Sequence, residues 1–508
     1  MMGLVALVGS GPGDPGLLTL RAAELLAQAD VVVYDHLANF NFLSHLRPSA
    51  ELVNVGKRSN HHTLPQEKIN QLLVDLATQG KRVVRLKGGD PYVFGRGGEE
   101  AEFLVAQGIP FEVVSGVTSA VAVPAAAGIP ITHRDHCTSF HVITGHERAE
   151  RGESALDFAL LAKLSGTLIF LMGLTNLETI TQQLMAEGKS PQTPIAVISR
   201  GCSTRQRQIL GTLKDIASLV KEQGIEAPAV TVVGSVANLA EVLRSSRPRL
   251  PLQGQRILVT RTRTQAGRLS AKLRAQGADV LEIPLIRIEA SNEKPMWGSL
   301  CAEIPKANWL VLTSENGVEI FLNGLCEHHL DLRKLAQVRI AAIGPATASK
   351  LQKAGLIADL VPSSYTVDAL TQELLPRLSP QSRLLLARAD IANPSIAEAL
   401  QQAGHTVTEY PIYKTQPEHS RQSILRDLLE QGSLDWITFA SSSTVESFIQ
   451  VLGTRHPIPA SCRVACIGPV TAKTARQNGL TVHAEAKEFT LDGLIQALLD
   501  SNSSQEVS

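Results

Sequence analysis

The chain has 508 residues, too many for one hydrophobic core, which predicts at least two domains. Lys and Arg together number 48, as do Asp and Glu, so bulk charge gives no support for nucleic-acid binding. No apolar stretch reaches the roughly 18 residues that span a bilayer, and the six cysteines form no CxxC pair. We therefore expect a cytoplasmic protein whose partners are neither membranes nor nucleic acids.

Strand and helix patterns alternate along the first half of the chain. This alternation is typical of α/β layers around a largely parallel sheet. Two more strand-like runs, 167–172 and 229–233, flank a stretch that alternates in the same way. The predicted elements before them are a strand at 5–8, a helix at 17–28, a strand at 31–34, a helix at 66–78 and a strand at 82–86.

A change of composition at residues 244–254 divides the chain into two units. This stretch is basic, contains proline and lacks periodicity, so we predict a linker between a first unit at 1–243 and a second at 255–500. Residues 501–508, "SNSSQEVS", are polar and predict a disordered tail.

The second unit contains an internal repeat. "WLVLTSENGVEIF" from Trp309 resembles "WITFASSSTVESF" from Trp436, and "RIAAIGPATA" from Arg339 resembles "RVACIGPVTA" from Arg463. Two further segment pairs, "ILVTR" with "LLLAR" and "GADVLEIPLIRI" with "GHTVTEYPIYKT", follow the same order. The repeat predicts two similar small α/β domains.

Loops after the predicted strands of the first unit combine glycine with selected charges. "GSGPGDPG" lacks the third glycine of the dinucleotide fingerprint and the GK[ST] of a P-loop. "RLKGGDPYVFGRGGEE" follows a later strand, and Asp35 and Lys57 also follow strands. Each segment alone also fits a tight turn, and Asp35 fits a helix N-cap as well as a catalytic base. Their clustering beside one sheet favours a ligand site.

Longer motifs carry a family resemblance over residues 3 to 240. They include "GPGDPGLLTLRA", "YDHL", "GKR", "VVRLKGGDPYVFGRGGEEAEFL", "GVTSA" and "GIPITHR". In these motifs, the first unit resembles uroporphyrinogen-III C-methyltransferase, an enzyme of the tetrapyrrole methylase family. The resemblance implies two α/β domains with S-adenosylmethionine in the cleft between them. It also implies methylation of uroporphyrinogen III at C2 and then C7, which gives precorrin-2.

The same resemblance implies roles for single residues. Asp35 matches the proposed proton acceptor and Lys57 the proposed proton donor. Because the substrate carries eight carboxylates, Arg96 and Arg134 are candidates to bind it. Matches to the family's cofactor contacts are Pro12, Gly88, Gly89, Asp90, Val93, Thr118, Ser119, Met172 and Gly201.

The first unit departs from the family at three positions. The family usually has Pro at Ser115, Tyr at Ala126 and often Tyr at Leu171. These departures leave the packing of the substrate and the rate of the second methylation open.

The second unit resembles uroporphyrinogen-III synthase over residues 255–497. The motifs are "ILVTR", "TSENGV", "AAIGPATA", "YPIYKT", "ITFASSSTV" and "CIGPVTA". The resemblance implies one subdomain from about 255–288 plus 414–500 and another from 289–413. It implies ring closure of hydroxymethylbilane with inversion of the last pyrrole, using no cofactor and no metal.

Hydroxyl and guanidinium groups at equivalent places of the repeat are the candidate site residues. Tyr413 matches the tyrosine proposed to assist loss of the substrate hydroxyl. Backbone N–H groups where each "IGPxTA" loop opens a helix can hold a carboxylate. An N-cap role is as good an interpretation for each Ser or Thr. The candidates for substrate binding are Arg261, Ser314, Thr347, Arg388, Ser441 and Thr471.

Together the two units predict a bifunctional enzyme that makes uroporphyrinogen III and then methylates it. Two alternatives remain: the second unit is a tetrapyrrole-binding module without activity, or the first methylates a different tetrapyrrole. The "HRDHC" cluster at 133–137 matches no common zinc spacing, so we expect no metal site. The resemblance favours a homodimer, and the product can feed either sirohaem or cobalamin.

Overall fold

The computed structural model describes most of the chain. The described residues are 3–35, 40–47, 49–56, 64–145, 156–243, 250–261, 263–390, 394–453 and 458–506, without the side chains of 263–265 and 504–506. They form two compact units, one made of residues 1–283, 423–440 and 457–508, and the other of residues 284–422 and 441–456.

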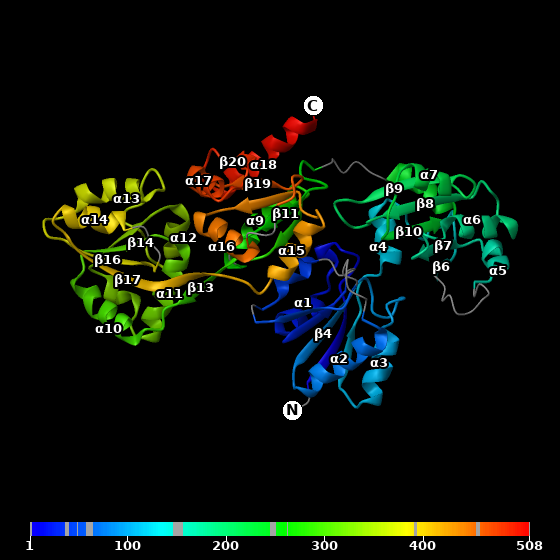
Figure 1. The fold of residues 1–508 in the computed structure, drawn as a ribbon, viewed down its shortest axis with the longest axis horizontal. Helices are drawn as coiled ribbons and strands as arrows, with labels where there is room; N and C mark the ends of the chain where they lie inside the picture. The colour runs from blue at the N-terminus through cyan, green and yellow to red at the C-terminus, as the bar shows by residue number, and fades with distance from the viewer. Residues whose placement is uncertain are drawn as a thin grey trace. The chain divides into compact units, whose positions relative to one another are not determined.

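The first sheet is fully parallel, with strand order β3-β2-β4-β1-β5. Its strands are β1 (Leu4–Gly9), β2 (Val31–Tyr34), β3 (Glu51–Asn54), β4 (Arg82–Lys87) and β5 (Phe111–Val114). Its helices are α1 (Leu20–Gln28), α2 (Gln66–Thr78), α3 (Gly97–Ala106) and α4 (Ser119–Ala126). Figure 1 shows α2 and α3 beside β4, and their apolar faces bury the core over the sheet.

The first helix begins later than the sequence predicts. Residues Pro15–Leu17 form a 3-10 turn, and α1 starts only after Thr19. The Thr19 hydroxyl accepts a hydrogen bond from the backbone N–H of Ala22, which caps the helix there.

The second sheet is mixed, with strand order β6-β7-β10-β8-β9. β6 is parallel to β7, but β10 is antiparallel to both β7 and β8, so the expected parallel arrangement holds for only part of this sheet. The strands are β6 (Phe140–Thr144), β7 (Thr167–Leu171), β8 (Pro194–Ser199), β9 (Arg207–Thr212) and β10 (Ala229–Val233). The helices are α5 (Phe158–Lys163), α6 (Leu177–Ala186), α7 (Ile216–Glu222) and α8 (Leu239–Leu243).

The third sheet is parallel, with order β12-β11-β18-β19-β20. Its strands are β11 (Arg256–Val259), β12 (Asp279–Glu282), β18 (Trp436–Phe439), β19 (Arg463–Cys466) and β20 (Ala484–Glu485). Elements that share its unit are α9 (Arg263–Ala275), α15 (Gln422–Glu430), α17 (Pro469–Gln477) and α18 (Leu491–Glu506).

The fourth sheet has order β13-β17-β16-β14-β15, and only its edge strand β13 is antiparallel. Its strands are β13 (Ile286–Ala290), β14 (Trp309–Leu312), β15 (Arg339–Ala342), β16 (Arg383–Ala389) and β17 (Thr406–Pro417). The helices of this unit are α10 (Lys294–Glu303), α11 (Glu315–Glu327), α12 (Pro345–Lys353), α13 (Val367–Leu374), α14 (Ser395–Gln402) and α16 (Ser442–Leu452).

Each copy of the internal repeat contributes strands to both the third and the fourth sheet. The third sheet combines β11 and β12 from the first repeat with β18 and β19 from the second, whereas the fourth combines β16 and β17 with β14 and β15. In both sheets the pairing is equivalent, because β11 lies between β12 and β18 just as β16 lies between β17 and β14. Each sheet is therefore built from halves of two repeats.

The predicted linker and the predicted C-terminal tail differ from the expectation. The stretch predicted as a linker ends in a turn whose Leu252 is fully buried in the core of the third sheet, while 244–249 lie outside the described residues. α18 continues to Glu506, through residues for which the sequence predicts a disordered tail. The Asn502 side chain accepts a hydrogen bond from Arg463 at 2.9 Å, which anchors the end of this helix.

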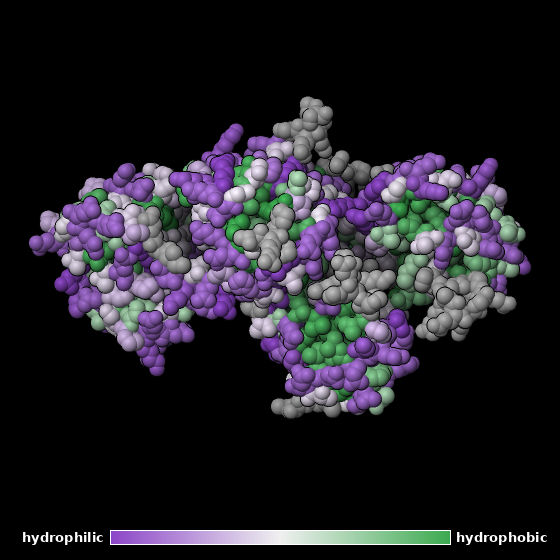
Figure 2. Space-filling view, in the orientation of Figure 1, coloured by the Kyte–Doolittle hydropathy of each residue, from purple (hydrophilic) through white to green (hydrophobic). Residues whose placement is uncertain are grey.

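Hydrophilic side chains cover most of the surface that Figure 2 shows. A hydrophobic patch interrupts them in the region that β4 and α2 occupy in Figure 1. No helix among the described residues is long and apolar enough to cross a membrane.

Candidate functional site

The glycine loops of the first sheet touch one another backbone to backbone. The N–H of Gly89 donates to the carbonyl of Gly11 at 2.8 Å, and the N–H of Gly11 donates to the carbonyl of Gly89 at 3.2 Å. A Cβ on Gly116 would lie 2.1 Å from the Gly89 oxygen, and one on Gly9 would lie 2.5 Å from the Gly116 nitrogen. The loops after β1, β4 and β5 can meet this closely because side chains are missing there.

The Asp90 side chain ties two of these loops together. One carboxylate oxygen accepts from the backbone N–H of Tyr92 at 2.8 Å, and the other accepts from Gly116 at 3.1 Å. The sequence predicts that Asp90 contacts a cofactor, and the structure shows that both its oxygens also shape the loop. Gly88, Gly89 and Val93 in the same loop are partly exposed.

Further predicted cofactor residues gather at this edge of the sheet. The Thr118 hydroxyl caps α4, and a Cβ on Gly89 would lie 3.8 Å from the Ser119 nitrogen. Pro12 directly follows Gly11, whose backbone pairs with Gly89. The structure therefore brings the segments around Pro12, Gly89 and Ser119 together.

The two cofactor residues predicted in the second sheet follow its strands. Gly201 comes after β8, and a Cβ there would lie 2.2 Å from the Val123 side chain of α4, so this loop packs on the helix that Ser119 begins. Met172 comes directly after β7. Its backbone is in the left-handed region (φ 56°), and the residue is 52% exposed. A bulky apolar side chain held outward in a strained conformation is typical of ligand contact.

These loops have the chemistry that S-adenosylmethionine requires. Exposed apolar side chains of Tyr92, Phe94 and Met172 offer surface to an adenine ring or a thioether chain. The glycine residues beside them leave backbone peptide groups open to polar contacts. When bound, this molecule supplies an electrophilic methyl group on a sulfonium.

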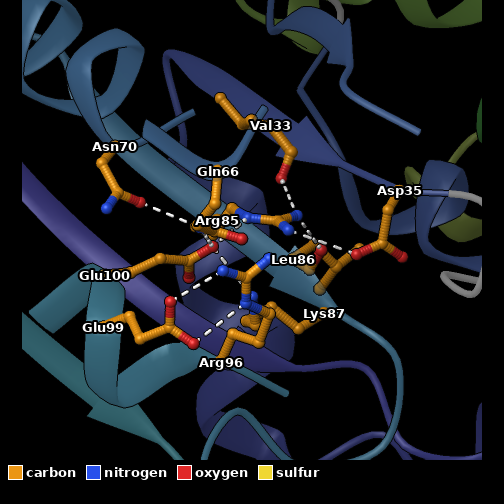
Figure 3. A network of polar contacts seen from close by, with 10 residues as sticks. All are labelled: Val33, Asp35, Gln66, Asn70, Arg85, Leu86, Lys87, Arg96, Glu99 and Glu100. Carbon is orange, nitrogen blue, oxygen red and sulfur yellow. Dashed lines mark hydrogen bonds and ion pairs between the residues drawn. The ribbon is translucent and has the colours of Figure 1, made fainter. Parts of the chain in front are cut away.

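A network of charged side chains surrounds Arg85, on the strand β4 that leads into the glycine loop (Figure 3). Arg85 and Lys87 alternate on the central strand β4, and their side chains are only 4% and 5% exposed. One oxygen of the fully buried Glu100, on α3, accepts from Arg85 Nε at 3.1 Å and Lys87 Nζ at 2.9 Å. Gln66 also donates to this oxygen at 3.1 Å. Burial, together with repulsion from Arg85, lowers the pKa of Lys87.

Asp35 forms the partly exposed end of this network. It follows β2, and one carboxylate oxygen accepts from Arg85 Nη2 at 3.3 Å while the side chain stays 27% exposed. The predicted proton acceptor is therefore ion-paired to the buried cluster (Figure 3). Lys57, the predicted proton donor, lies outside the described residues.

The two arginines predicted to bind substrate in the first unit are exposed. Arg96 lies in the left-handed region (φ 59°), and its guanidinium donates twice to the Glu99 carboxylate, at 2.9 and 2.7 Å. Arg134 is exposed in the loop that follows α4. Both arginines remain predictions as substrate contacts.

The three departures from the family occupy different surroundings. Ser115 and Ala126 are exposed, whereas Leu171 is buried at the end of β7. The carbonyl of Ala126 accepts a hydrogen bond from Gln206 at 3.3 Å.

Tyr413 and Ser314 form a hydroxyl pair in the second unit. The Tyr413 oxygen lies 2.8 Å from the Ser314 oxygen, and Ser314 accepts from the Gly317 N–H at 2.9 Å as the N-cap of α11. Since the Ser314 oxygen accepts from the helix N-terminus, its own proton can point to the tyrosine. Burial raises the pKa of Tyr413, the Ser314 contact opposes this, and nearby Asp390 adds to it.

The remaining predicted hydroxyls divide into two kinds. Ser441, like Ser314, is an N-cap, and it accepts from the Thr444 N–H at 3.3 Å. Thr347 and Thr471 are not caps, because glycines cap α12 and α17, and both threonines are buried in the first turn. The N-cap interpretation thus holds for the serines and fails for the threonines.

The two predicted arginines of the second half also differ. Arg388 is buried on β16 and forms an ion pair with Glu409. Arg261 follows β11 and is half-buried. Arg261 and Thr471 belong to the first compact unit, whereas Ser314, Thr347, Arg388, Tyr413 and Ser441 belong to the second.

Sequence reasoning missed the buried members of the charge network. In the sequence, Arg85, Lys87 and Glu100 stand within a glycine-rich motif that draws attention to its glycines. The signal was nevertheless present, because "VVRLKGG" places two cations at alternate positions of a strand otherwise fit for burial. Charges at such positions require a buried partner.

Comparison with known proteins relates the two parts of the chain to two families. Residues 4–217 match the family of tetrapyrrole (corrin/porphyrin) methylases, and residues 267–496 match uroporphyrinogen-III synthase HemD. The porphyrin biosynthesis protein HemD of Ruminiclostridium josui is 40% identical over 98% of both chains. The chain belongs to the tetrapyrrole methylases in its N-terminal half and to the uroporphyrinogen-III synthases in its C-terminal half.

Proteins that correspond to the methylase half only are also similar to this chain. The S-adenosyl-L-methionine-dependent uroporphyrinogen III methyltransferase of Methanosarcina barkeri is 55% identical over 48% of this chain and 96% of its own length. Uroporphyrin-III C-methyl transferase of Thermus thermophilus, solved with S-adenosyl homocysteine, is 39% identical over 47% of this chain and all of its own, with a TM-score of 0.40.

The chain therefore combines S-adenosylmethionine-dependent uroporphyrinogen-III methyltransferase and uroporphyrinogen-III synthase activities. Among the described residues, no three His, Cys, Asp or Glu side chains are grouped so that they could hold a metal ion.

Proposed function

We propose that the synthase half closes hydroxymethylbilane to uroporphyrinogen III and that the methylase half methylates this product at C2 and C7 to give precorrin-2. Ring closure expels the substrate hydroxyl as water and inverts the last pyrrole. The observation that supports two distinct proton-transfer sites is the contrast between an ion-paired carboxylate, Asp35, and a buried neutral phenol, Tyr413.

In the methylase half, Asp35 is the proton acceptor. A methylated macrocycle must lose a proton, and a partly exposed carboxylate held by Arg85 can take it. The glycine loops hold the methyl donor close to the tetrapyrrole, so positioning supplies much of the rate. Lys57 is the corresponding proton donor, and Arg96 and Arg134 pair with the substrate carboxylates.

In the synthase half, Tyr413 assists departure of the hydroxyl. Its neutral phenol can donate a hydrogen bond to the leaving oxygen, and Ser314 orients it. The remaining hydroxyl and guanidinium candidates bind substrate carboxylates, namely Arg261, Thr347, Arg388, Ser441 and Thr471.

The state of assembly and the pathway belong to this proposal as well. We expect a cytoplasmic homodimer formed through the methylase half. The precorrin-2 it makes is a substrate for oxidation and metal insertion towards sirohaem or cobalamin by other enzymes.

One incubation tests both halves together. The chain is given hydroxymethylbilane and S-adenosylmethionine, and the products are analysed for isomer type and number of added methyl groups. A dimethylated type III product is expected. Type I macrocycle would contradict the synthase assignment and indicate a binding module, and unmethylated type III would contradict the methylase assignment.

A further inference from the structure

Arg85 and three other charged side chains, of Lys87, Glu100 and Asp35, form a chain of ion pairs (Figure 3) that runs from the buried core to the surface. Glu100 is fully buried, Arg85 and Lys87 are nearly so, and Asp35 is 27% exposed. With all four groups ionised, two positive charges balance two negative ones. Buried ions require such pairing, because each costs several kcal/mol to remove from water.

Arg85 divides its three nitrogens among different partners. Nε donates to Glu100 at 3.1 Å, Nη1 donates to the Leu86 carbonyl at 3.0 Å and approaches the Val33 carbonyl at 3.5 Å, and Nη2 donates to Asp35 at 3.3 Å. A planar guanidinium held on three sides has no freedom to turn. The nitrogen that faces Asp35 is therefore fixed in place by contacts inside the core.

Glu100 holds this arrangement in turn. One of its oxygens accepts from three side chains, while the other is buried without a hydrogen-bond partner among the described residues. An unsatisfied carboxylate oxygen is costly. The two ion pairs and the Gln66 hydrogen bond on the first oxygen offset this cost, and the same ion pairs fix Arg85 and Lys87.

We infer that Arg85 is a positioning residue of the methylase, which orients the Asp35 carboxylate for proton acceptance and is itself oriented by Glu100. This inference rests on the proposed role of Asp35. Arg85 does not touch the substrate in this account, since its side chain is 4% exposed and surrounded by protein groups. Its effect on the reaction passes through Asp35.

A double-mutant cycle tests the inference in the full chain. Arg85→Gln, Asp35→Asn and the double variant are compared for kcat of uroporphyrinogen-III methylation, the KM for S-adenosylmethionine and the melting temperature. We expect Arg85→Gln to lower kcat by about tenfold or more with little change in KM, because the base is misplaced while the glycine loops stay intact. In the Asp35→Asn background the same change should cost little, because coupled residues are non-additive.

Arg82→Gln is the matched control. Arg82 lies on the same strand and faces a carboxylate, with Nε 3.6 Å from Asp30, but its side chain is 52% exposed. This variant should keep kcat and KM. If all variants melt near the temperature of the parent chain, their differences in kcat arise at the site and not from loss of the fold.

Several results would overturn the inference. An unchanged kcat in Arg85→Gln contradicts it, as does an equal loss in both backgrounds. If Arg85→Gln does not fold, Glu100→Gln replaces it, since it weakens the hold on Arg85 while keeping the shape. An unchanged kcat in that variant is equally contradictory. If Asp35→Asn itself methylates normally, the role of Asp35 fails instead, and the two failures are thus distinguished.

Discussion

The methylase and synthase halves place their proton-transfer groups in opposite surroundings. In the methylase half, Asp35 ends a chain of ions that begins in the core at Glu100. In the synthase half, Tyr413 is a buried phenol that faces another neutral hydroxyl, Ser314. The two sites therefore suit opposite directions of proton transfer. A partly exposed carboxylate can accept a proton, whereas a buried phenol remains protonated and can donate one.

The largest expected effect comes from removing the carboxylate. Asp35→Asn should lower the rate of methylation by about 10²- to 10⁴-fold, because a general base typically contributes that much. Ring closure of hydroxymethylbilane by the same preparation should keep the parental rate. Loss of both activities would show that the substitution damages the fold, and the comparison between the halves would then fail.

Removing the phenol should have the reverse pattern. Tyr413→Phe should slow ring closure by about 10²-fold and leave methylation of added uroporphyrinogen III unchanged. Tyr410→Phe is the control, because Tyr410 is buried on the same strand and pairs with Ser299 at 3.2 Å. Equal rates for the two variants would exclude a special role for Tyr413.

The pH dependence of ring closure sharpens this prediction. Burial raises the pKa of Tyr413 above its ordinary value of about 10. A proton donor works below its pKa, so the fall in the ring-closure rate that deprotonation of Tyr413 causes should appear only above about pH 10. Stopped-flow rates from pH 8 to 11 measure this fall. A fall in rate well below pH 10 that is absent in Tyr413→Phe would contradict the buried environment of Tyr413.

A methyl group in the glycine loops should affect the methylase alone. Gly116→Ala would place a Cβ 2.1 Å from the Gly89 oxygen, so the loops must separate at a cost of about 1–3 kcal/mol. Calorimetry should show weaker S-adenosylmethionine binding. Gly98→Ala in α3 is the control, since a Cβ there meets nothing within 4 Å. Equal affinities in the two variants would rule out a role for loop contact.

The smallest expected effect belongs to Ser314. Ser314→Ala removes both the cap of α11 and the partner of Tyr413. Loss of an N-cap costs about 1 kcal/mol of stability, measured as a lower midpoint of denaturant unfolding. Thr366→Ala removes the cap of α13, at a residue outside the proposed site. If Ser314 also orients the phenol, its replacement should slow ring closure more than replacement of Thr366, and equal rates would limit Ser314 to capping.

The sequence predicted the order of elements better than their pairing. Alternating strands and helices, the internal repeat and the glycine loops are local patterns, and they predicted the α/β class. The antiparallel position of β10 and the exchange of repeat halves between two sheets depend on contacts far apart in the chain. Local periodicity carries no information about such contacts.

The candidate site was predicted to a similar extent. The family motifs located Asp35 and the segments around Gly89, and the structure brings the glycine loops together through their backbones. The buried cluster behind Asp35 is not evident from the sequence, because Glu100, which holds Arg85, lies on a helix where its charge resembles that of an exposed residue. Likewise, the sequence could not show that glycines, not Thr347 and Thr471, cap their helices.

The most direct test of the two-site account uses Asp35→Asn and Tyr413→Phe side by side. Each variant is incubated with hydroxymethylbilane and S-adenosylmethionine, and separately with uroporphyrinogen III and S-adenosylmethionine. We expect Asp35→Asn to accumulate unmethylated type III product, and Tyr413→Phe to methylate added uroporphyrinogen III at the parental rate but to make little of it from hydroxymethylbilane. Loss of both activities in either folded variant would contradict the separation of the two sites.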